Sequence, residues 1–162
     1  METFYVVCDN IRSLENIGSI FRTADAVGVS KVFLCGISGK PPVGEDQRTF
    51  FSRNTVIAKT ALGAEKTIPF EYHAHTWRLL ETLKEKGVFV VALEQHAKAI
   101  SYRALRPKFP LALVVGNEVR GVSKKVLRRC NKVIFLPMKG KKESLNVSVA
   151  FGVASYNLIN PR

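Results

Sequence analysis

Apolar residues are grouped along the chain in short runs of two kinds. In the first kind nearly every position is apolar, as in VFVVAL at residues 88–93 and LALVVG at residues 111–116. Such runs are typical of strands that are buried on both faces of a parallel sheet. Strands are predicted at residues 4–8, 31–35, 67–72, 88–93, 111–116 and 132–136.

In the second kind of run, apolar residues recur at the period of a helix with one buried face. Ile17, Ile20, Ala24 and Val27 give this pattern in the first such segment. Helices are predicted at residues 14–27, 55–62, 76–86, 123–130 and 145–158. Strands that alternate with helices predict an α/β fold whose mainly parallel sheet is flanked by helices.

The segment from residue 132 to residue 158 changes from strand to helix within a few residues. Pro137 ends the strand because it has no N–H to donate to a sheet, and Gly140 lies among lysines in a polar loop. Ser144 is the expected N-cap of the helix. A helix N-terminus after a glycine turn offers N–H groups and a positive dipole end to a ligand, although many such units bind nothing. The expected buried stripe of this helix is Leu145, Val149, Gly152/Val153 and Tyr156.

Composition limits the class of protein. The 162 residues, 46% of them hydrophobic, suit one domain over residues 1–162, and the longest predicted loop is the Gly- and Pro-bearing stretch at 36–53. Cys8, Cys35 and Cys130 lie beside apolar residues, so we expect free thiols packed in the core. The three histidines have no Cys or carboxylate at ligand spacing, and we expect no metal site.

The charge balance points to a partner. Twenty-five Lys and Arg residues against 13 Asp and Glu residues give a formal net charge of +12, which favours a polyanion such as nucleic acid. A membrane surface is the competing interpretation. It is disfavoured because no long apolar segment, basic amphipathic helix or leader is recognisable. We therefore expect a cytoplasmic protein.

Two further segments carry polar residues that the predicted helices and strands do not themselves require. Asn16 and Arg22 lie on the first predicted helix, where a solvated surface position is the alternative interpretation of Arg22. Glu118 follows the buried strand 111–116, between Gly116 and Gly121. This places a carboxylate at the carboxyl edge of a parallel sheet, where ligands bind in open α/β folds, although a plain turn is equally compatible.

The three segments resemble, in order, the three motifs of the SpoU/TrmH family of RNA ribose methyltransferases, in the SPOUT class. The first reads NIGSIFRTA from Asn16, the second LALVVGNEVRG from Leu111, and the third LPMKGKKESLNVSVAFGVASY from Leu136. The resemblance implies a C-terminal trefoil knot, a homodimer, and transfer of a methyl group from S-adenosylmethionine to a ribose 2′-hydroxyl of structured RNA, either tRNA or rRNA.

The resemblance also implies roles for individual residues. Arg22 is the family's catalytic arginine, and we expect it to act as a fixed cation, because a guanidinium group does not readily give up its proton to become a base. The residues expected to orient Arg22 and the ribose are Asn16, Glu118, Ser144 and Asn146. The residues expected to hold the cofactor are Leu93, Gly116, Leu136, Met138 and Leu145. Gly116 and Gly140 are expected to allow close approach of the backbone.

Two rival functions remain open. One is a non-catalytic RNA-binding module on the same fold, and the other is a small-molecule nucleotide-binding protein, which the charge and the lack of a GxGxxG motif disfavour. No additional RNA-binding domain is recognisable, so basic residues outside the motifs are expected to neutralise phosphates. They include Arg48, Arg53, Arg103, Arg106, Lys108, Lys124, Lys125, Arg128 and Arg129.

Overall fold

A computed structural model describes residues 2–41 and 54–160. In this part of the chain, the strands form one sheet in which every neighbouring pair is parallel, in the order β3-β2-β1-β6-β4-β7-β5. The strands are β1 (Phe4–Asp9), β2 (Lys31–Cys35), β3 (Phe70–His73), β4 (Phe89–Leu93), β5 (Ile100–Ser101), β6 (Leu111–Gly116) and β7 (Lys132–Phe135). The predicted α/β fold with a parallel sheet is confirmed.

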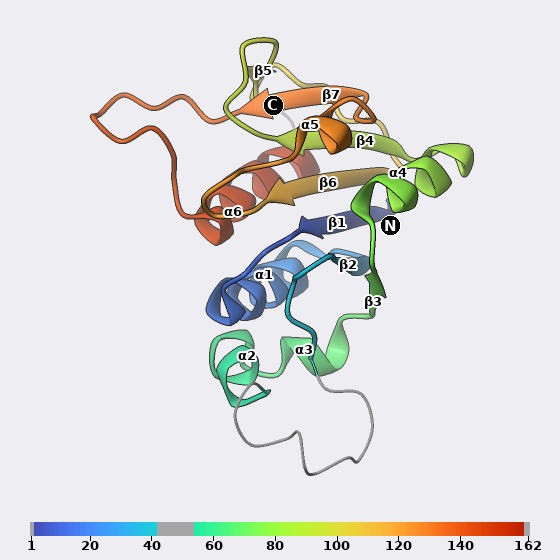
Figure 1. Ribbon diagram of the computed structural model, residues 1–162, viewed down its shortest axis with the longest axis vertical. Coiled ribbons are helices and arrows are strands. Elements are labelled where there is room, and N and C mark those ends of the chain that lie inside the picture. Colours follow the sequence, from blue (N-terminus) through green and yellow to red (C-terminus); the bar gives the residue numbers. More distant parts are fainter. Residues whose placement is uncertain (1, 42–53, 161–162) are drawn as a thin grey trace.

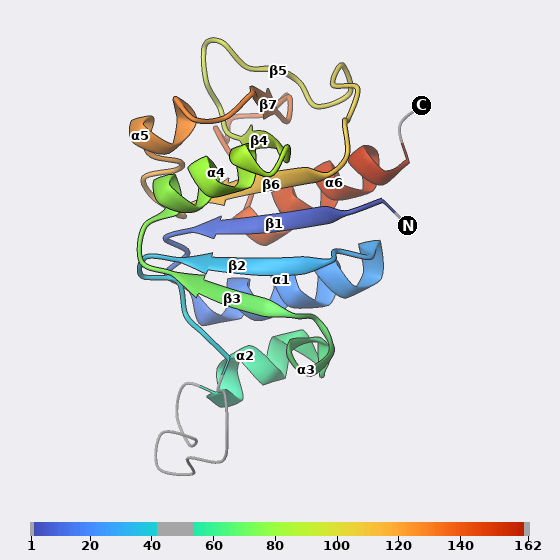
Figure 2. The ribbon, with the colours of Figure 1, turned by 90° about the vertical axis from the view of Figure 1, so that its right-hand side faces the viewer.

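Helices cover both faces of this sheet (Figures 1 and 2). On one face, α1 (Leu14–Val27), α2 (Asn54–Ala61) and α6 (Val147–Ile159) enclose a core with the inner side chains of β1, β2 and β6. On the other face, α4 (Thr76–Glu85) and α5 (Lys124–Leu127) pack on the opposite side chains of the same strands. Strand β6 is buried at every position, as its unbroken apolar sequence predicts.

Helix α1 has the predicted bounds and the predicted buried stripe. The Ser13 hydroxyl accepts the Asn16 N–H at 3.1 Å and caps its start, and Gly28 ends it in the left-handed region at φ 75°. Ile17, Ile20, Phe21, Ala24 and Val27 are all buried. Helix α1 therefore packs on the sheet through one continuous apolar face.

Helix α6 departs from prediction in two ways. It begins at Val147, and Asn146, not Ser144, is its N-cap, because the Asn146 side chain accepts the Ser148 N–H at 2.9 Å. The predicted stripe is also wrong, because Leu145, Val149, Val153 and Tyr156 are exposed. The core is filled instead by the other side of the helix, namely Phe151, Ala154 and Leu158.

Smaller differences have local causes. The strand predicted at residues 67–72 is β3, at Phe70–His73, because Thr67 belongs to the short helix α3 (Ala64–Thr67). Strand β5 has two residues, too few for a sequence pattern. Helix α5 is shorter than the predicted 123–130. Residues 42–53 of the predicted loop lie outside the described residues, and the trefoil knot stays a prediction.

All three cysteines are free, as predicted, and burial raises the pKa of the Cys35 and Cys130 thiols to about 12. Among the described residues, no helix is both long enough and apolar enough to span a membrane.

Candidate functional site

The chain leaves the centre of the sheet in two directions. From β1 it passes outward to β2 and β3, whereas β4, β7 and β5 lie on the other side of β6. The connections that leave the carboxyl ends of β1, β6 and β4 therefore run in opposite directions, and this is where ligands bind in open α/β sheets. Three connecting segments meet there, after β4, after β6 and before α6, and they enclose a cavity of about 410 Å³, called the first cavity below.

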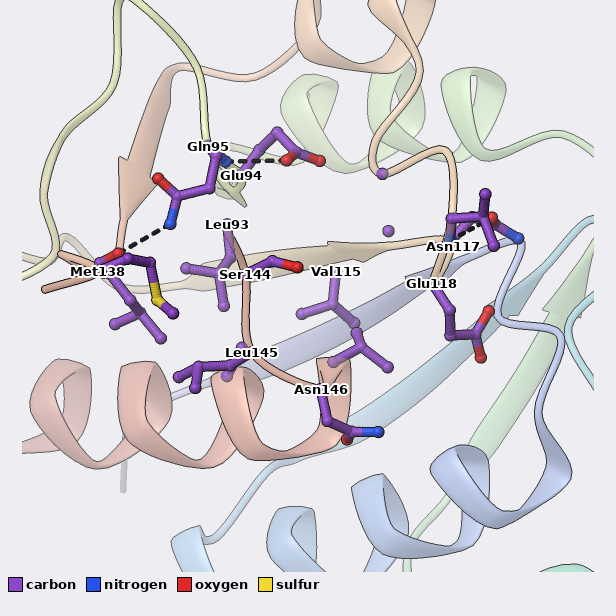
Figure 3. Close-up of a pocket in the computed structure, with 16 residues that line it drawn as sticks. Leu93, Glu94, Gln95, Val115, Asn117, Glu118, Met138, Ser144, Leu145 and Asn146 are labelled. Atoms are coloured by element: carbon purple, nitrogen blue, oxygen red, sulfur yellow. Dashed lines mark hydrogen bonds between the residues drawn. The ribbon is translucent and has the colours of Figure 1, made fainter. Parts of the chain in front are cut away.

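Residues from distant parts of the sequence line this first cavity (Figure 3). All the residues predicted to hold the cofactor border it, namely Leu93, Gly116, Leu136, Met138 and Leu145. Glu118, Ser144 and Asn146, which were predicted to orient the reactants, also line it. Figure 3 shows Glu118 and Asn146 at one end, which is polar, and Met138 at the other, together with the side chain of Gln95.

Several lining residues were not predicted from the sequence, and two of them, Glu94 and Gln95, join neighbouring segments. Glu94 accepts the Val122 N–H at 2.7 Å and the Gln95 N–H at 2.8 Å, and the Gln95 side chain donates to the Leu136 carbonyl at 2.8 Å. These bonds tie the end of β4 to the segments that follow β6 and β7. In the sequence, the signal for Glu94 and Gln95 was their position directly after the buried strand β4.

Glycine is required at one of the two positions where close approach was predicted. A Cβ on Gly116 would lie 2.4 Å from the Gly121 carbonyl carbon and from the Val122 nitrogen, so the wall of the cavity closes only around a bare α-carbon. Gly140 is different, because its φ is not positive and a Cβ there would meet nothing within 4 Å. The predicted close approach at Gly140 is therefore wrong.

An amide network joins helices α1 and α6 to the segment after β6. Asn146 donates through Nδ2 to Asn16 Oδ1 at 3.1 Å, and Asn16 donates through Nδ2 to Glu118 Oε1 at 3.1 Å. Asn146 Oδ1 is occupied because it accepts from both the N–H and the hydroxyl of Ser148. The orientation of both amides is thus fixed by their partners.

The Glu118 carboxylate is the centre of this network. It also accepts the backbone N–H groups of Arg12 and Ser13, at 3.0 and 2.9 Å. Partial burial raises its pKa, but these N–H groups and the Asn16 amide outweigh burial and hold the pKa below its ordinary value. Glu118 is therefore an ionised acceptor that fixes the loop between β1 and α1.

Asn16 and Arg22 are the predicted site residues that do not line the first cavity. Asn16 is joined to the lining through Glu118 and Asn146, whereas Arg22 is not. The Arg22 side chain is exposed and makes no hydrogen bond or ion pair with another described residue. The next residue, Thr23, lines a shallow groove between α1 and α6 together with Val149, Gly152, Val153 and Tyr156, here called the α1–α6 groove. Arg22 therefore lies beside an exposed apolar surface.

Comparison with known proteins identifies the family. The sequence profile described as "SpoU rRNA Methylase family" matches residues 3–156. The chain belongs to this family. The 23S rRNA (guanosine-2'-O-)-methyltransferase RlmB of Ralstonia nicotianae is 34% identical over 157 residues, which are 97% of this chain and 58% of that protein. The chain spans 58 to 60% of the length of the first curated relatives that it matches.

Solved structures of SpoU relatives share the fold. The A. aeolicus TrmH/SpoU tRNA modifying enzyme superposes with a TM-score of 0.82 at 30% identity, over 98% of this chain and 75% of that one. The AdoMet-bound rRNA methyltransferase from Sinorhizobium meliloti superposes with a TM-score of 0.82 at 28% identity, over 98% of this chain and 56% of that one. The parallel sheet and its helices are therefore those of a SpoU fold.

The first cavity fits the adenosyl part of S-adenosylmethionine. Leu93, Val115, Leu136 and Leu145 give it aliphatic walls, and the segments after β6 and before α6 bring backbone groups to its edge. A flat, uncharged ring system requires this combination of apolar surface and a few polar groups. Within the described residues, no group of three or more His, Cys, Asp or Glu side chains is placed to hold a metal ion.

Proposed function

We propose that this chain is an S-adenosylmethionine-dependent methyltransferase that modifies a ribose 2′-hydroxyl of RNA, in the cytoplasm. The observation that carries the proposal is the polar end of the first cavity, where Asn16, Glu118 and Asn146 are joined in one network beside a pocket suited to the cofactor. The named activity of the 2'-O-methyltransferase relative and the formal charge of +12 support an RNA substrate.

The reaction depends more on how the ribose and the methyl donor are aligned than on protein groups that form bonds to them. When bound, S-adenosylmethionine supplies an electrophilic methyl group on a sulfonium sulfur. The ribose oxygen forms a bond to that carbon, the sulfur–carbon bond breaks, and the hydroxyl proton is lost to water or to an RNA phosphate. In-line geometry is the main demand, and the fixed amide of Asn146, which lines the first cavity, can orient the ribose while Asn16 holds that amide in place.

Arg22 stabilises negative charge in this proposal and does not act as a base. A guanidinium that stays charged can bind an RNA phosphate and the oxygen that becomes more negative as its proton leaves. Because Arg22 does not line the cavity of its own chain, it needs a neighbour to complete a site.

That neighbour is a second copy of the chain, packed on the α1–α6 groove. Val149, Val153 and Tyr156 are 51%, 42% and 52% exposed, on a helix whose opposite side fills the core. An apolar surface of this kind marks an interaction site. A homodimer that covers it would bring Arg22 to the first cavity of the partner.

The decisive experiment is a methyl-transfer assay. The protein is incubated with S-adenosylmethionine labelled on the methyl group and, separately, with bulk tRNA and bulk rRNA, and the modified nucleotide is then mapped. We expect label on a ribose 2′-oxygen in one of the two RNAs. Label on a base atom, or on neither RNA while the protein binds the cofactor, would contradict the proposal.

The rival function is RNA binding without catalysis. It requires neither an apolar cavity nor an ionised Glu118 held by Arg12, Ser13 and Asn16. Binding of S-adenosylmethionine, measured by calorimetry, separates the two functions, because a simple RNA-binding module has no reason to bind it.

A further inference from the structure

A second cavity, of about 940 Å³, adjoins the first at the segment that follows β6. Asn117, Glu118, Val119 and Gly121 line both cavities, so the two meet along this segment, called the shared wall below. The remaining walls come from the β1–α1 loop, the start of α1 and Ile37 after β2. Two substrates that react beside Glu118 can therefore each bind in a cavity of its own.

Arg12 and Arg120 line this second cavity and are not neutralised by any other described residue. Both side chains are exposed, and neither forms an ion pair with any acid among the described residues. An arginine that is not paired within its own protein, at the rim of a cavity, suits a phosphate group.

The acids that line the second cavity are already used by the protein. Glu118 accepts three N–H groups, and Glu15 accepts the Ser13 hydroxyl at 3.0 Å. Asp9 is buried and accepts from Thr76 and Asn10, and burial raises the pKa of its carboxyl group. Glu118 and Glu15 keep their negative charge, but their oxygens are bound by N–H and O–H donors, and neither pairs with Arg12 or Arg120. The selectivity of the cavity for an anion therefore rests on the two arginines and not on the net charge of the lining.

The backbones that carry these two arginines are held in place. The Arg12 N–H donates to Glu118 at 3.0 Å, and the Arg120 N–H donates to Asn117 Oδ1 at 2.9 Å. Asn117 Nδ2 in turn donates to the Asn10 carbonyl at 2.8 Å, which links the two loops. Preorganisation of this kind lowers the entropic cost of binding.

Resting on the function proposed above, we propose that the second cavity receives the acceptor nucleotide of the RNA, with Arg12 and Arg120 bound to the phosphates beside it. The ribose would then meet the methyl donor at the shared wall, next to Glu118. Each cavity has the chemistry of its substrate: aliphatic walls for the adenosyl group, and two arginines for the polyanion.

The test uses Arg12→Gln and Arg120→Gln, with Lys86→Gln as the matched control. Lys86 is exposed and directly follows α4. It lies close to the start of β4, at the amino ends of the strands, whereas both cavities lie at their carboxyl ends. The hydrogen bonds that hold the two loops come from backbone N–H groups, so the glutamine variants keep them. Binding of bulk tRNA and bulk rRNA is measured at several salt concentrations, and cofactor affinity is measured by calorimetry.

We expect each arginine variant to weaken RNA binding by about tenfold to a hundredfold and to lower the salt slope by about one, with cofactor affinity unchanged. Lys86→Gln should bind RNA like the wild type. Arginine variants that match the control would overturn the assignment, even if the wild type methylates RNA. A wild type that binds RNA through these arginines but transfers no methyl group would retain the site and contradict the proposed function instead.

Discussion

The first cavity combines aliphatic side chains with polar ones, whereas the lining of the second includes two arginines that form no ion pair with another described residue, although both open at the carboxyl ends of the same strands. The two share the wall from Asn117 to Gly121, and the hydrogen bonds of Glu118 and Asn16 join them further. The contrast shows how one sheet edge can separate two substrates of opposite character. A substitution in the first cavity should change cofactor affinity alone, and one in the second should change RNA affinity alone.

Arg22 lines neither cavity of its own chain, so it should give the largest effect on rate while cofactor affinity stays unchanged. Arg22→Ala should lower the methyl-transfer rate by about a hundred- to a thousand-fold, the usual cost of losing a stabiliser of developing charge. Arg22→Lys should keep a small residual rate because it keeps the charge but loses the planar fork. Single-turnover kinetics with a calorimetric measurement of cofactor affinity check both variants.

A mixed dimer tests whether Arg22 serves the partner's cavity. Arg22→Ala and Gly116→Val are each expected to be inactive, the second because its side chain collides with the Gly121 and Val122 backbone. Coexpressed, they form dimers in which one site has both Arg22 and an intact cavity, and activity should return. Absence of recovery in purified mixed dimers would mean that Arg22 acts within its own chain.

The dimer itself should be sensitive to charge at the α1–α6 groove. Val153→Asp places a carboxylate in the proposed apolar interface, at a cost of several kcal/mol, and should give a folded monomer in analytical ultracentrifugation. Leu62→Asp is the control, because Leu62 is 65% exposed and lies after α2, away from this groove. Dimers of equal stability in both variants would place the interface elsewhere.

A pair of glycine substitutions tests the wall of the first cavity. Gly116→Ala should cost about 1–3 kcal/mol of unfolding free energy, typical of an overpacked site, and should weaken cofactor binding. Gly140→Ala should change neither, since its Cβ would meet nothing within 4 Å. Urea unfolding and calorimetry measure both quantities. An effect at Gly140 equal to that at Gly116 would assign the cofactor to a different surface.

The smallest expected effect concerns Glu118, the shared wall. Its lowered pKa means that its contribution to stability is complete above the ordinary value near 4.5 and is lost as the pH falls through the lowered value. Glu118→Gln should cost about 1 kcal/mol at neutral pH. The difference from the wild type, measured by urea unfolding, should shrink in acid. A difference that is constant with pH would show that the carboxylate charge does not hold the β1–α1 loop.

The sequence predicted the architecture well where burial leaves no choice. Strand β6 is apolar throughout and has the predicted bounds, and so does α1 with its single stripe. Helix α6 shows the limit: it is apolar on both sides, so periodicity could not decide which side faces the core and selected the exposed one. Strand β5 was missed because pairing with β7, not its own pattern, defines it.

The three motifs identified residues that line the first cavity, but not how the residues of the site contact one another. Glu118 and Asn146 were expected near each other, yet the bridging position of Asn16 between them depends on how α1 packs against α6. Arg12 and Arg120 were missed because two isolated arginines in loops have no sequence signature. Their significance appears only when two loops, more than a hundred residues apart in the chain, are joined through Asn10 and Asn117.

The edges of the sheet have a consequence for how the protein behaves at high concentration. Parallel sheets with long free edges recruit further strands and aggregate. Here one edge strand, β5, has two residues, and the other, β3, has four and carries Glu71, which is paired with Lys31 at 3.3 Å. Neither edge offers a long row of free backbone groups, so self-association should be directed away from strand addition and toward the helical face.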